Sequence, residues 1–377
     1  AGSGPTGGQF NVSPRAIFQF SKLNLTGRAD TLSFRARAST LQGRGLLTYT
    51  SSNYFGWRNL SFQLSGLFDK SRDVLTFTST RYEGGTQLLY RLSPASSIAW
   101  RYSYRRIVAS DLHVNAQQIP LYSQPTRVSL FGVTWLRDRR DNAGDPGHGS
   151  LNTVSMDLAG QPIGSSASFV RLFTQNSTYT PIGRWLLFAR STRLGVSTPI
   201  GTSASTDIPL PERFFAGGGT TLRGFGLNQA GPRDPLTGFP VGGLTMLTFN
   251  QELRFPMRLP WIGNRVGGGI FYDAGNVFSR FGNVSLRSAP AAPVFSSVQP
   301  AVCVANCTND LAYLSHTVGF ALRYNTPVGP VSIDLGYQLN PANFLVPIGT
   351  AAPGQPQPLR LDRLPAFQFF VNLGTTF

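Results

Sequence analysis

The chain is dominated by segments in which apolar and polar residues alternate. Across 331–339 the odd positions carry valine, isoleucine, leucine, tyrosine and leucine, and the even positions carry serine, aspartate, glycine and glutamine. The same period of two runs through 31–39 and 98–105, where arginines occupy polar positions. A period of two is that of a β-strand, because successive side chains point to opposite faces of a sheet. The pattern predicts an all-β protein.

Strand length indicates which solvents the sheet faces. A membrane-spanning strand needs about 9 to 11 residues, and alternating segments of about this length recur along the chain without a competing helical period. We predict strands at about 15–25, 30–40, 44–55, 59–69, 76–93, 97–108, 126–138, 150–160, 168–180, 184–197, 243–256, 265–278, 315–326, 330–339 and 365–377.

The connections between these segments alternate between short and long, as in outer-membrane barrels, which have short periplasmic turns and longer external loops. Tight turns rich in proline and glycine occur at 94–97, 181–183 and 327–330. Counting back from a periplasmic C-terminus places every long segment outside. The long segments are 109–124, 199–242, 279–314 and 340–364.

An even number of strands requires one more strand before Arg15, where residues 1–14 offer only a glycine-rich stretch. We therefore predict a 16-stranded antiparallel transmembrane β-barrel over 15–377. Residues 1–14 are expected to be a linker or the remnant of a weak first strand. On this interpretation the chain is cut from a longer protein.

Composition agrees with a wall that faces lipid. Only 13% of the residues are charged, against about 25% in soluble domains. Aromatic residues make up 12% of the chain, which argues against intrinsic disorder because disordered chains contain few of them. Lys22 and Lys70 are the only lysines among 33 basic residues. The arginines are spread along the chain, whereas nucleic-acid binders cluster their basic residues. We expect no nucleic-acid partner.

The sequence offers few residues that could form an active site or a metal site. Two cysteines and three histidines offer too few ligands for a metal site, so we expect no metal and no cofactor. Cys303 and Cys307 favour a small disulfide loop in an oxidising compartment over two free thiols. No Gly-x-Ser-x-Gly nucleophile elbow occurs. We expect no enzymatic activity; the alternative is a site assembled across strands, as in barrel lipases and proteases.

Five segments carry motifs, in a fixed order and spacing. They are Leu-Arg-Asp-Arg-Arg-Asp-Asn at 136–142, Thr-Leu-Arg-Gly-Phe at 221–225 after Phe-Ala-Gly-Gly-Gly at 215–219, Asn-Gln-Glu-Leu-Arg-Phe-Pro at 250–256, Phe-Tyr-Asp-Ala-Gly-Asn at 271–276, and the aromatic-rich C-terminal segment 367–377. Together they resemble the BamA and TamA superfamily of outer-membrane assembly and translocation barrels. This superfamily includes bacterial surface antigens, two-partner secretion transporters and the mitochondrial sorting-and-assembly barrel. The resemblance covers nearly the whole chain and only the family's barrel domain.

The resemblance implies a long external loop that folds back into the barrel lumen. Its tip would carry Arg223, Gly224 and Phe225, with Asp273 as the partner of the arginine and Glu252 as a second partner. An arginine can be held by bidentate pairing to carboxylates, and glycines permit the sharp turns of a tucked-in hairpin. The alternative is a solvated turn and two ordinary lumen-facing acids.

Two further sites follow from the resemblance. Asp138 and Arg139 stand at a strand end that resembles the family's turn before the ninth strand, and they are candidates for the lumen network; a simple polar turn is the equal alternative. Gly374 and the terminal Phe377 belong to a last strand that resembles a sorting signal. In the family this strand forms a weak seam with the first strand.

The resemblance implies an integral protein of the bacterial outer membrane, with a periplasmic C-terminus. It would insert other barrels or translocate polypeptide through the seam. The implied partners are outer-membrane lipids, unfolded outer-membrane or secreted client polypeptides, periplasmic repeats in cis and accessory lipoproteins. Two alternatives remain open: a passive pore made anion-preferring by lumen arginines, and a barrel that anchors a secreted N-terminal domain. The candidate pore arginines are Arg35, Arg37, Arg101 and Arg105.

Overall fold

The computed structural model describes residues 15–259, 263–295, 303–326, 329–349 and 358–373. Within them, fifteen strands form one continuous antiparallel sheet in which each strand pairs with the next main-sheet strand along the chain. These strands are β1 (Arg15–Leu23), β2 (Asp30–Ser39), β3 (Gln42–Ser51), β4 (Leu60–Ser71), β5 (Thr78–Ser93), β6 (Ser96–Ser110), β7 (Thr126–Asp138), β8 (Gly149–Ala159), β9 (Phe169–Ile182), β10 (Leu186–Pro199), β11 (Thr245–Leu259), β12 (Gly263–Phe278), β15 (Ser315–Thr326), β16 (Gly329–Gln338) and β19 (Phe367–Leu373).

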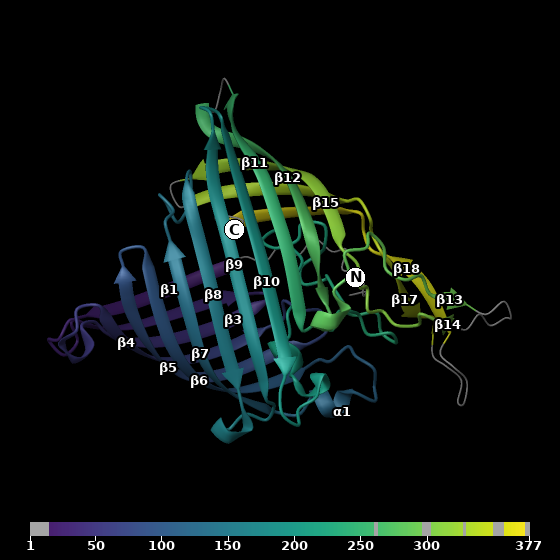
Figure 1. The fold of residues 1–377 in the computed structure, drawn as a ribbon, viewed down its shortest axis with the longest axis horizontal. Coiled ribbons are helices and arrows are strands. Elements are labelled where there is room, and N and C mark those ends of the chain that lie inside the picture. The colour runs from purple at the N-terminus through teal and green to yellow at the C-terminus, as the bar shows by residue number, and fades with distance from the viewer. Residues whose placement is uncertain (1–14, 260–262, 296–302, 327–328, 350–357, 374–377) are drawn as a thin grey trace.

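Each of the fifteen predicted strands is present at its predicted place. The predicted first strand of the sixteen falls in residues 1–14, which lie outside the described residues, so that strand stays a prediction. In the part of the chain that the structure describes, β1 and β19 are the two edges of the sheet. Figure 1 shows the sheet as a strongly curved wall of tilted strands.

Two hairpins that the sequence pattern did not predict lie within the long segments. One pairs β13 (Val294–Phe295) with β14 (Cys303–Ala305), and the other pairs β17 (Asn343–Pro347) with β18 (Leu359–Arg363). Both project beyond the ends of the main strands (Figure 1). The helical elements are the single turn α1 (Ile119–Tyr122) and the 3-10 turns Tyr54–Gly56, Gln161–Ile163, Ser205–Asp207, Leu210–Glu212 and Phe281–Asn283. Among the described residues, no helix combines the length and hydrophobicity that a bilayer crossing requires.

The two faces of the sheet reverse the burial found in a soluble protein. On β6, Tyr102 and Tyr104 are exposed, whereas Ser103 and Arg105 between them are buried. On β16, Leu335 is 37% exposed, whereas the neighbouring Asp334 is fully buried. Exposed apolar side chains on one face and buried polar ones on the other are the arrangement of a membrane barrel, whose outer face meets lipid and whose inner face is polar.

The long segments gather at one end of the sheet, because antiparallel pairing brings the connections after β6, β10, β12 and β16 to the same side. Hydrogen bonds join them: Arg233 N donates to Asn309 O over 2.8 Å, and Thr237 Oγ1 donates to His113 O over 2.9 Å. We call these joined connections the cap. A hydrophobic core lies among them and the adjoining strand ends. Its members include Leu222, Phe225, Met246, Val277, Tyr313 and Phe344.

Candidate functional site

The connection between β10 and β11, residues 200–244, is here called the inner loop, and it reaches across the inside of the sheet. Glu212 near its start contacts Arg105 of β6 and Arg171 of β9. Arg223 at its tip contacts Asp273 of β12. The inner loop therefore touches early and late strands at once; the family resemblance implied only that it folds into the lumen.

The tip arginine is enclosed by acceptors. Nε and Nη2 of Arg223 donate to the two carboxylate oxygens of Asp273, each over 2.8 Å, and its backbone N donates to the same group over 3.1 Å. Nη1 donates to Glu252 Oε2 over 2.9 Å. The guanidinium lies 3.4 Å from the ring centre of Phe271, and its side chain is only 2% exposed. Both predicted carboxylate partners thus meet Arg223.

Further charged side chains neutralise the buried group of Arg223, Asp273 and Glu252. The second carboxylate oxygen of Glu252 accepts from Arg254 Nε over 3.0 Å and from Arg323 Nη2 over 2.8 Å. Asp334, on the neighbouring β16, accepts from Asn372 Nδ2 of β19 over 2.6 Å. A buried charge is costly unless it is paired and hydrogen-bonded, so the cluster holds together as a unit. We call Arg223, Glu252, Asp273, Arg254 and Arg323 the tip lock.

Small residues let the tip approach the wall. A Cβ atom at Gly224 would lie 2.0 Å from Thr317 Oγ1 of β15, a contact that would push the tip away. Gly217, before the tip, has a φ of +119°, which favours glycine because side chains rarely adopt it. Phe225 is buried in the hydrophobic core of the cap. The Gly-Phe pair after Arg223 therefore fits a close wall on one side and an apolar core on the other.

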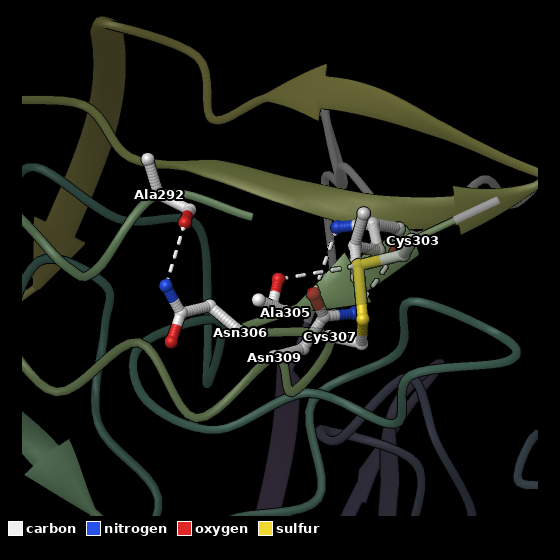
Figure 2. The surroundings of a disulfide bond; sticks show 7 residues. Ala292, Cys303, Ala305, Asn306, Cys307 and Asn309 are labelled. Carbon is white, nitrogen blue, oxygen red and sulfur yellow. Dashed lines mark hydrogen bonds between the residues drawn. A yellow bond between two sulfur atoms is a disulfide. The ribbon is translucent and has the colours of Figure 1, made fainter. Parts of the chain in front are cut away.

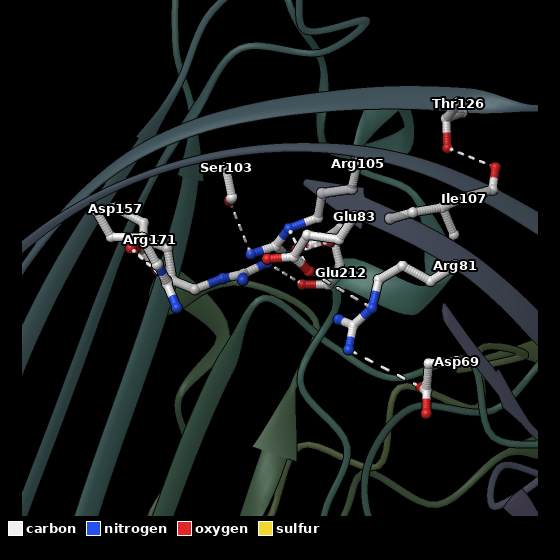
Figure 3. A network of polar contacts seen from close by, with 11 residues as sticks. Asp69, Arg81, Glu83, Ser103, Arg105, Ile107, Thr126, Asp157, Arg171 and Glu212 are labelled. Atoms are coloured by element: carbon white, nitrogen blue, oxygen red, sulfur yellow. Dashed lines mark hydrogen bonds and ion pairs between the residues drawn. The ribbon is translucent and has the colours of Figure 1, made fainter. Parts of the chain in front are cut away.

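A second ion-pair cluster anchors the inner loop to strands β5, β6 and β9 of the wall (Figure 3). Glu212 accepts from Arg105 Nη1 over 2.7 Å and from Arg171 Nη2 over 2.8 Å. Arg105 Nε also lies 3.5 Å from Glu83 Oε2. Burial opposes ionisation of Glu212, but the charges of Arg105 and Arg171 outweigh it and lower the pKa of Glu212 to about 2. We call these three residues with Glu83 the base lock.

The sequence pattern did not reveal Glu212, because a single acid in a loop carries no period or motif. The composition offered one signal, because acidic residues are scarce: 17 stand against 33 basic ones. An acid near lumen arginines therefore has many partners. Arg254 and Arg323 were missed for the complementary reason, since they are two among many scattered arginines.

The candidates Asp138 and Arg139 do not join either lock. Asp138 instead pairs within its own turn with Arg140, whose Nε and Nη2 lie 2.9 and 2.8 Å from its carboxylate oxygens. The backbone N of Arg139 donates to Ser150 O over 2.8 Å. The adjacent arginine satisfies the Asp138 carboxylate locally, which is the arrangement of a polar turn, and a role of Asp138 in the lumen network stays a prediction.

The predicted disulfide joins Cys303 and Cys307 in the hairpin that β14 forms (Figure 2). Asn306 between them donates from Nδ2 to Ala292 O over 3.0 Å. Gly374 and Phe377 lie outside the described residues, so their predicted roles stay predictions. Among the described residues, no cluster of three or more histidine, cysteine or acidic side chains is arranged to hold a metal ion.

An apolar outer face, a charged inner face and an arginine-tipped loop held inside define an outer-membrane β-barrel with an internal loop. Residues 24–377 match the family model of the Omp85 superfamily domain. The chain belongs to this superfamily.

Relatives in sequence and structure agree with this family. The chain is 27% identical over 158 residues to the outer membrane protein assembly factor BamA of Nitratidesulfovibrio vulgaris, covering 42% of the chain and 20% of that protein. It is 26% identical over 210 residues to a SAM50-like protein of Schizosaccharomyces pombe, covering 55% of the chain and 42% of that protein. The chain therefore spans less than half of either relative.

Among solved structures, BamA from Haemophilus ducreyi lacking POTRA domains 1–3 is similar in fold, with a TM-score of 0.70 at 17% identity. The match covers 94% of this chain and 66% of that one. CdiB from Acinetobacter baumannii gives a TM-score of 0.50 at 12% identity, over 96% of this chain and 57% of that one. At such identities these likenesses concern the fold alone.

Proposed function

We propose that this barrel inserts other β-barrel proteins into the outer membrane, or translocates polypeptide across it, by offering strand edges to a client. The observation that carries the proposal is that the described sheet ends in two edge strands, β1 and β19. Backbone groups at a strand edge are costly to leave unpaired in lipid. A client strand that pairs with such an edge would satisfy them by strand addition.

Contact between β19 and the inner loop supports a role for the loop in positioning this edge. Asn372 of β19 lies against Gly219, where a Cβ atom would come within 2.3 Å of its side chain. Nδ2 of the same Asn372 donates to Asp334 of β16. Another residue of β16, Gly336, lies against the backbone carbonyl of Arg223. The tip lock and the last described strand thus share neighbours, so the loop would brace the edge while the client pairs.

The name of a relative suggests which clients this barrel handles. BamA is named as an outer membrane protein assembly factor, and we infer the same client class here: unfolded outer-membrane or secreted polypeptides. We further propose a periplasmic C-terminus with the four long segments outside, and partners in the form of lipids, periplasmic repeats in cis and accessory lipoproteins. We infer that the barrel is not an enzyme and uses no cofactor.

A passive pore is the second candidate, favoured by the inward arginines Arg35, Arg101 and Arg105. Arg105 is engaged by Glu212 of the inner loop, and Arg101 Nη2 lies 3.2 Å from Asp157 Oδ1. Rings of free basic side chains select anions, but paired ones do so less. The loop in the lumen therefore favours the assembly proposal over the pore.

The assembly proposal is tested by client folding into vesicles. The full chain is reconstituted into phospholipid vesicles, an unfolded outer-membrane barrel is added, and its acquisition of protease resistance is followed. We expect faster client folding than in vesicles that hold an unrelated barrel at equal protein density. Equal rates in the two preparations would count against insertion and leave translocation to be assayed with a secreted client.

A further inference from the structure

The outer face of strands β2 to β6 contains a hollow, here called the glycine hollow. Gly66 of β4 pairs with Gly84 of β5. Gly45 of β3 pairs with Phe68 and stands two residues further toward the long-loop end. A Cβ atom at any of these three positions would meet no other atom within 4 Å. The missing side chains leave a shallow hollow of about 560 Å³ in the wall.

Apolar side chains border the glycine hollow and show that it faces outward. Phe68 and Tyr82 stand on its edge with ring centres 5.3 Å apart, and both are exposed. Their chain neighbours Asp69 and Glu83 point the other way, toward the arginines of the lumen (Figure 3). In a membrane barrel the outward face meets lipid, so this hollow lies among acyl chains.

Two arginines stand directly opposite each other beside the hollow. Arg106 of β6 borders the hollow and pairs across the ladder with Arg127 of β7, and both are exposed on the outer face. Like charges directly opposite on neighbouring strands destabilise a sheet. The position of Arg106, four residues before the end of β6 at Ser110, puts the pair near the long-loop rim rather than the bilayer centre.

The surroundings add positive charge on this face, and the nearby acids Glu83 and Asp111 make contacts elsewhere. Lys70 of β4 is also exposed on the outer face, two residues nearer the rim than Phe68. Glu83 is turned inward to Arg105, and Asp111, beyond the strand end, accepts from Thr78. Among the ion pairs between described residues, none includes Arg106 or Arg127. We call Lys70, Arg106 and Arg127 the rim cations.

The two features point to one ligand. We propose that this face binds a membrane lipid with an anionic phosphate headgroup: the phosphate lies between Arg106 and Arg127, and an acyl chain lies in the glycine hollow below them. Guanidinium groups bind phosphate through paired hydrogen bonds, which relieves the repulsion between the arginines. The hollow lies toward the membrane centre from the rim cations, as an acyl chain requires. This site goes beyond client handling and needs only that the barrel sits in a bilayer.

The test is lipid binding to the purified full chain in non-ionic detergent, measured by native mass spectrometry with phosphatidylglycerol and phosphatidylcholine. We expect preferential retention of phosphatidylglycerol. The double variant Arg106→Gln with Arg127→Gln should weaken that binding about tenfold or more, because each lost hydrogen bond to a charged group is worth at least that factor. Arg190→Gln is the matched control: Arg190 is also exposed, but it lies near the opposite end, where its Nε donates to Thr178 Oγ1 over 3.0 Å.

A second variant tests the hollow without touching the charges. Gly66→Leu should weaken binding of long-chain phosphatidylglycerol and leave binding of its dihexanoyl analogue unchanged, since only the former occupies the hollow. Unchanged binding in the double arginine variant overturns the proposal, as does equal retention of phosphatidylcholine. Displacement by inorganic phosphate as effective as by unlabelled lipid would also overturn it, because the site would then be one for free anions. None of these readouts depends on client folding, so the two proposals fail separately.

Discussion

Arg223 shows how a single side chain fixes the position of a long loop. Three of its four hydrogen bonds to Asp273 and Glu252 use the planar fork of the guanidinium, and the fourth comes from its backbone N. The point charge of lysine does not reproduce the geometry of the fork. The sequence predicted these partners because all three residues stand in motifs. It did not predict Arg254 and Arg323, because balancing a buried acid depends on which strands become neighbours.

Replacing Arg223 with alanine should weaken the inner loop strongly. The substitution leaves the buried carboxylates of Asp273 and Glu252 without their positive partner. Breaking a buried ion pair costs roughly 3 to 5 kcal/mol. Heat unfolding in detergent should therefore begin at lower temperature, with Arg223→Lys intermediate. Arg190→Ala, on the exposed outer face, is the control and should melt like the parent. Identical melting of parent and Arg223→Ala would mean that the tip lock does not stabilise the barrel.

Glu212 gives the base lock a defined pH dependence. Its pKa falls from the ordinary 4.5 to about 2 in the folded protein, which corresponds to roughly 3 kcal/mol of stabilisation. Because the folded pKa is the lower one, this stabilisation is complete above pH 4.5 and is lost as the pH falls through about 2.

The variant Glu212→Gln isolates that contribution. At neutral pH it should be less stable than the parent, since Arg105 and Arg171 lose their charged partner. The difference in free energy of unfolding should shrink between pH 4.5 and pH 2, where the parent also loses the charge. Denaturant unfolding of both proteins across this range measures it. A difference that stays constant with pH would assign the effect of Glu212 to packing rather than charge.

Among elements, the long strands were predictable and the loop hairpins were not. A strand such as β16 alternates over its whole length because one face meets lipid and the other the lumen. β13 spans only Val294–Phe295 and β17 only Asn343–Pro347, too short for a period to emerge. These hairpins depend on contacts between loops, such as Leu345 N donating to Asn309 Oδ1 over 2.7 Å.

The disulfide should act on its own hairpin and not on the barrel. Cys303 and Cys307 are four residues apart, and a short closed loop restricts the unfolded chain less than a long one. The variant Cys303→Ser with Cys307→Ser should keep the melting temperature of the sheet but be cut sooner by protease within 303–314. A large drop in melting temperature would show that this hairpin supports the wall.

In the whole molecule, the two locks tie the inner loop to two separate groups of strands on the inner face of the wall. Glu212 reaches β6 and β9, and Arg223 reaches β11 and β12. The resemblance implied an inserted loop, but only the folded wall shows that it is held at two places. We expect a loop held in this way to obstruct the lumen.

Conductance in planar bilayers should report this obstruction. The parent should give small currents, and the double variant Glu212→Gln with Arg223→Ala should give larger, anion-preferring steps, because the loop is released and lumen arginines lose their partners. The single variant Arg190→Gln should behave like the parent. A steady, large anion current from the parent would favour the passive pore instead.

The central claim is that clients engage the sheet at its edges, and position-specific photo-crosslinking tests it most directly. A photoreactive residue replaces Val371 on β19, or Phe188 on β10 as a mid-sheet control, and an unfolded barrel client is added to the reconstituted full chain. We predict crosslinks to the client from position 371 and none from position 188. Equal capture at both positions, or capture at 188 alone, would contradict the account.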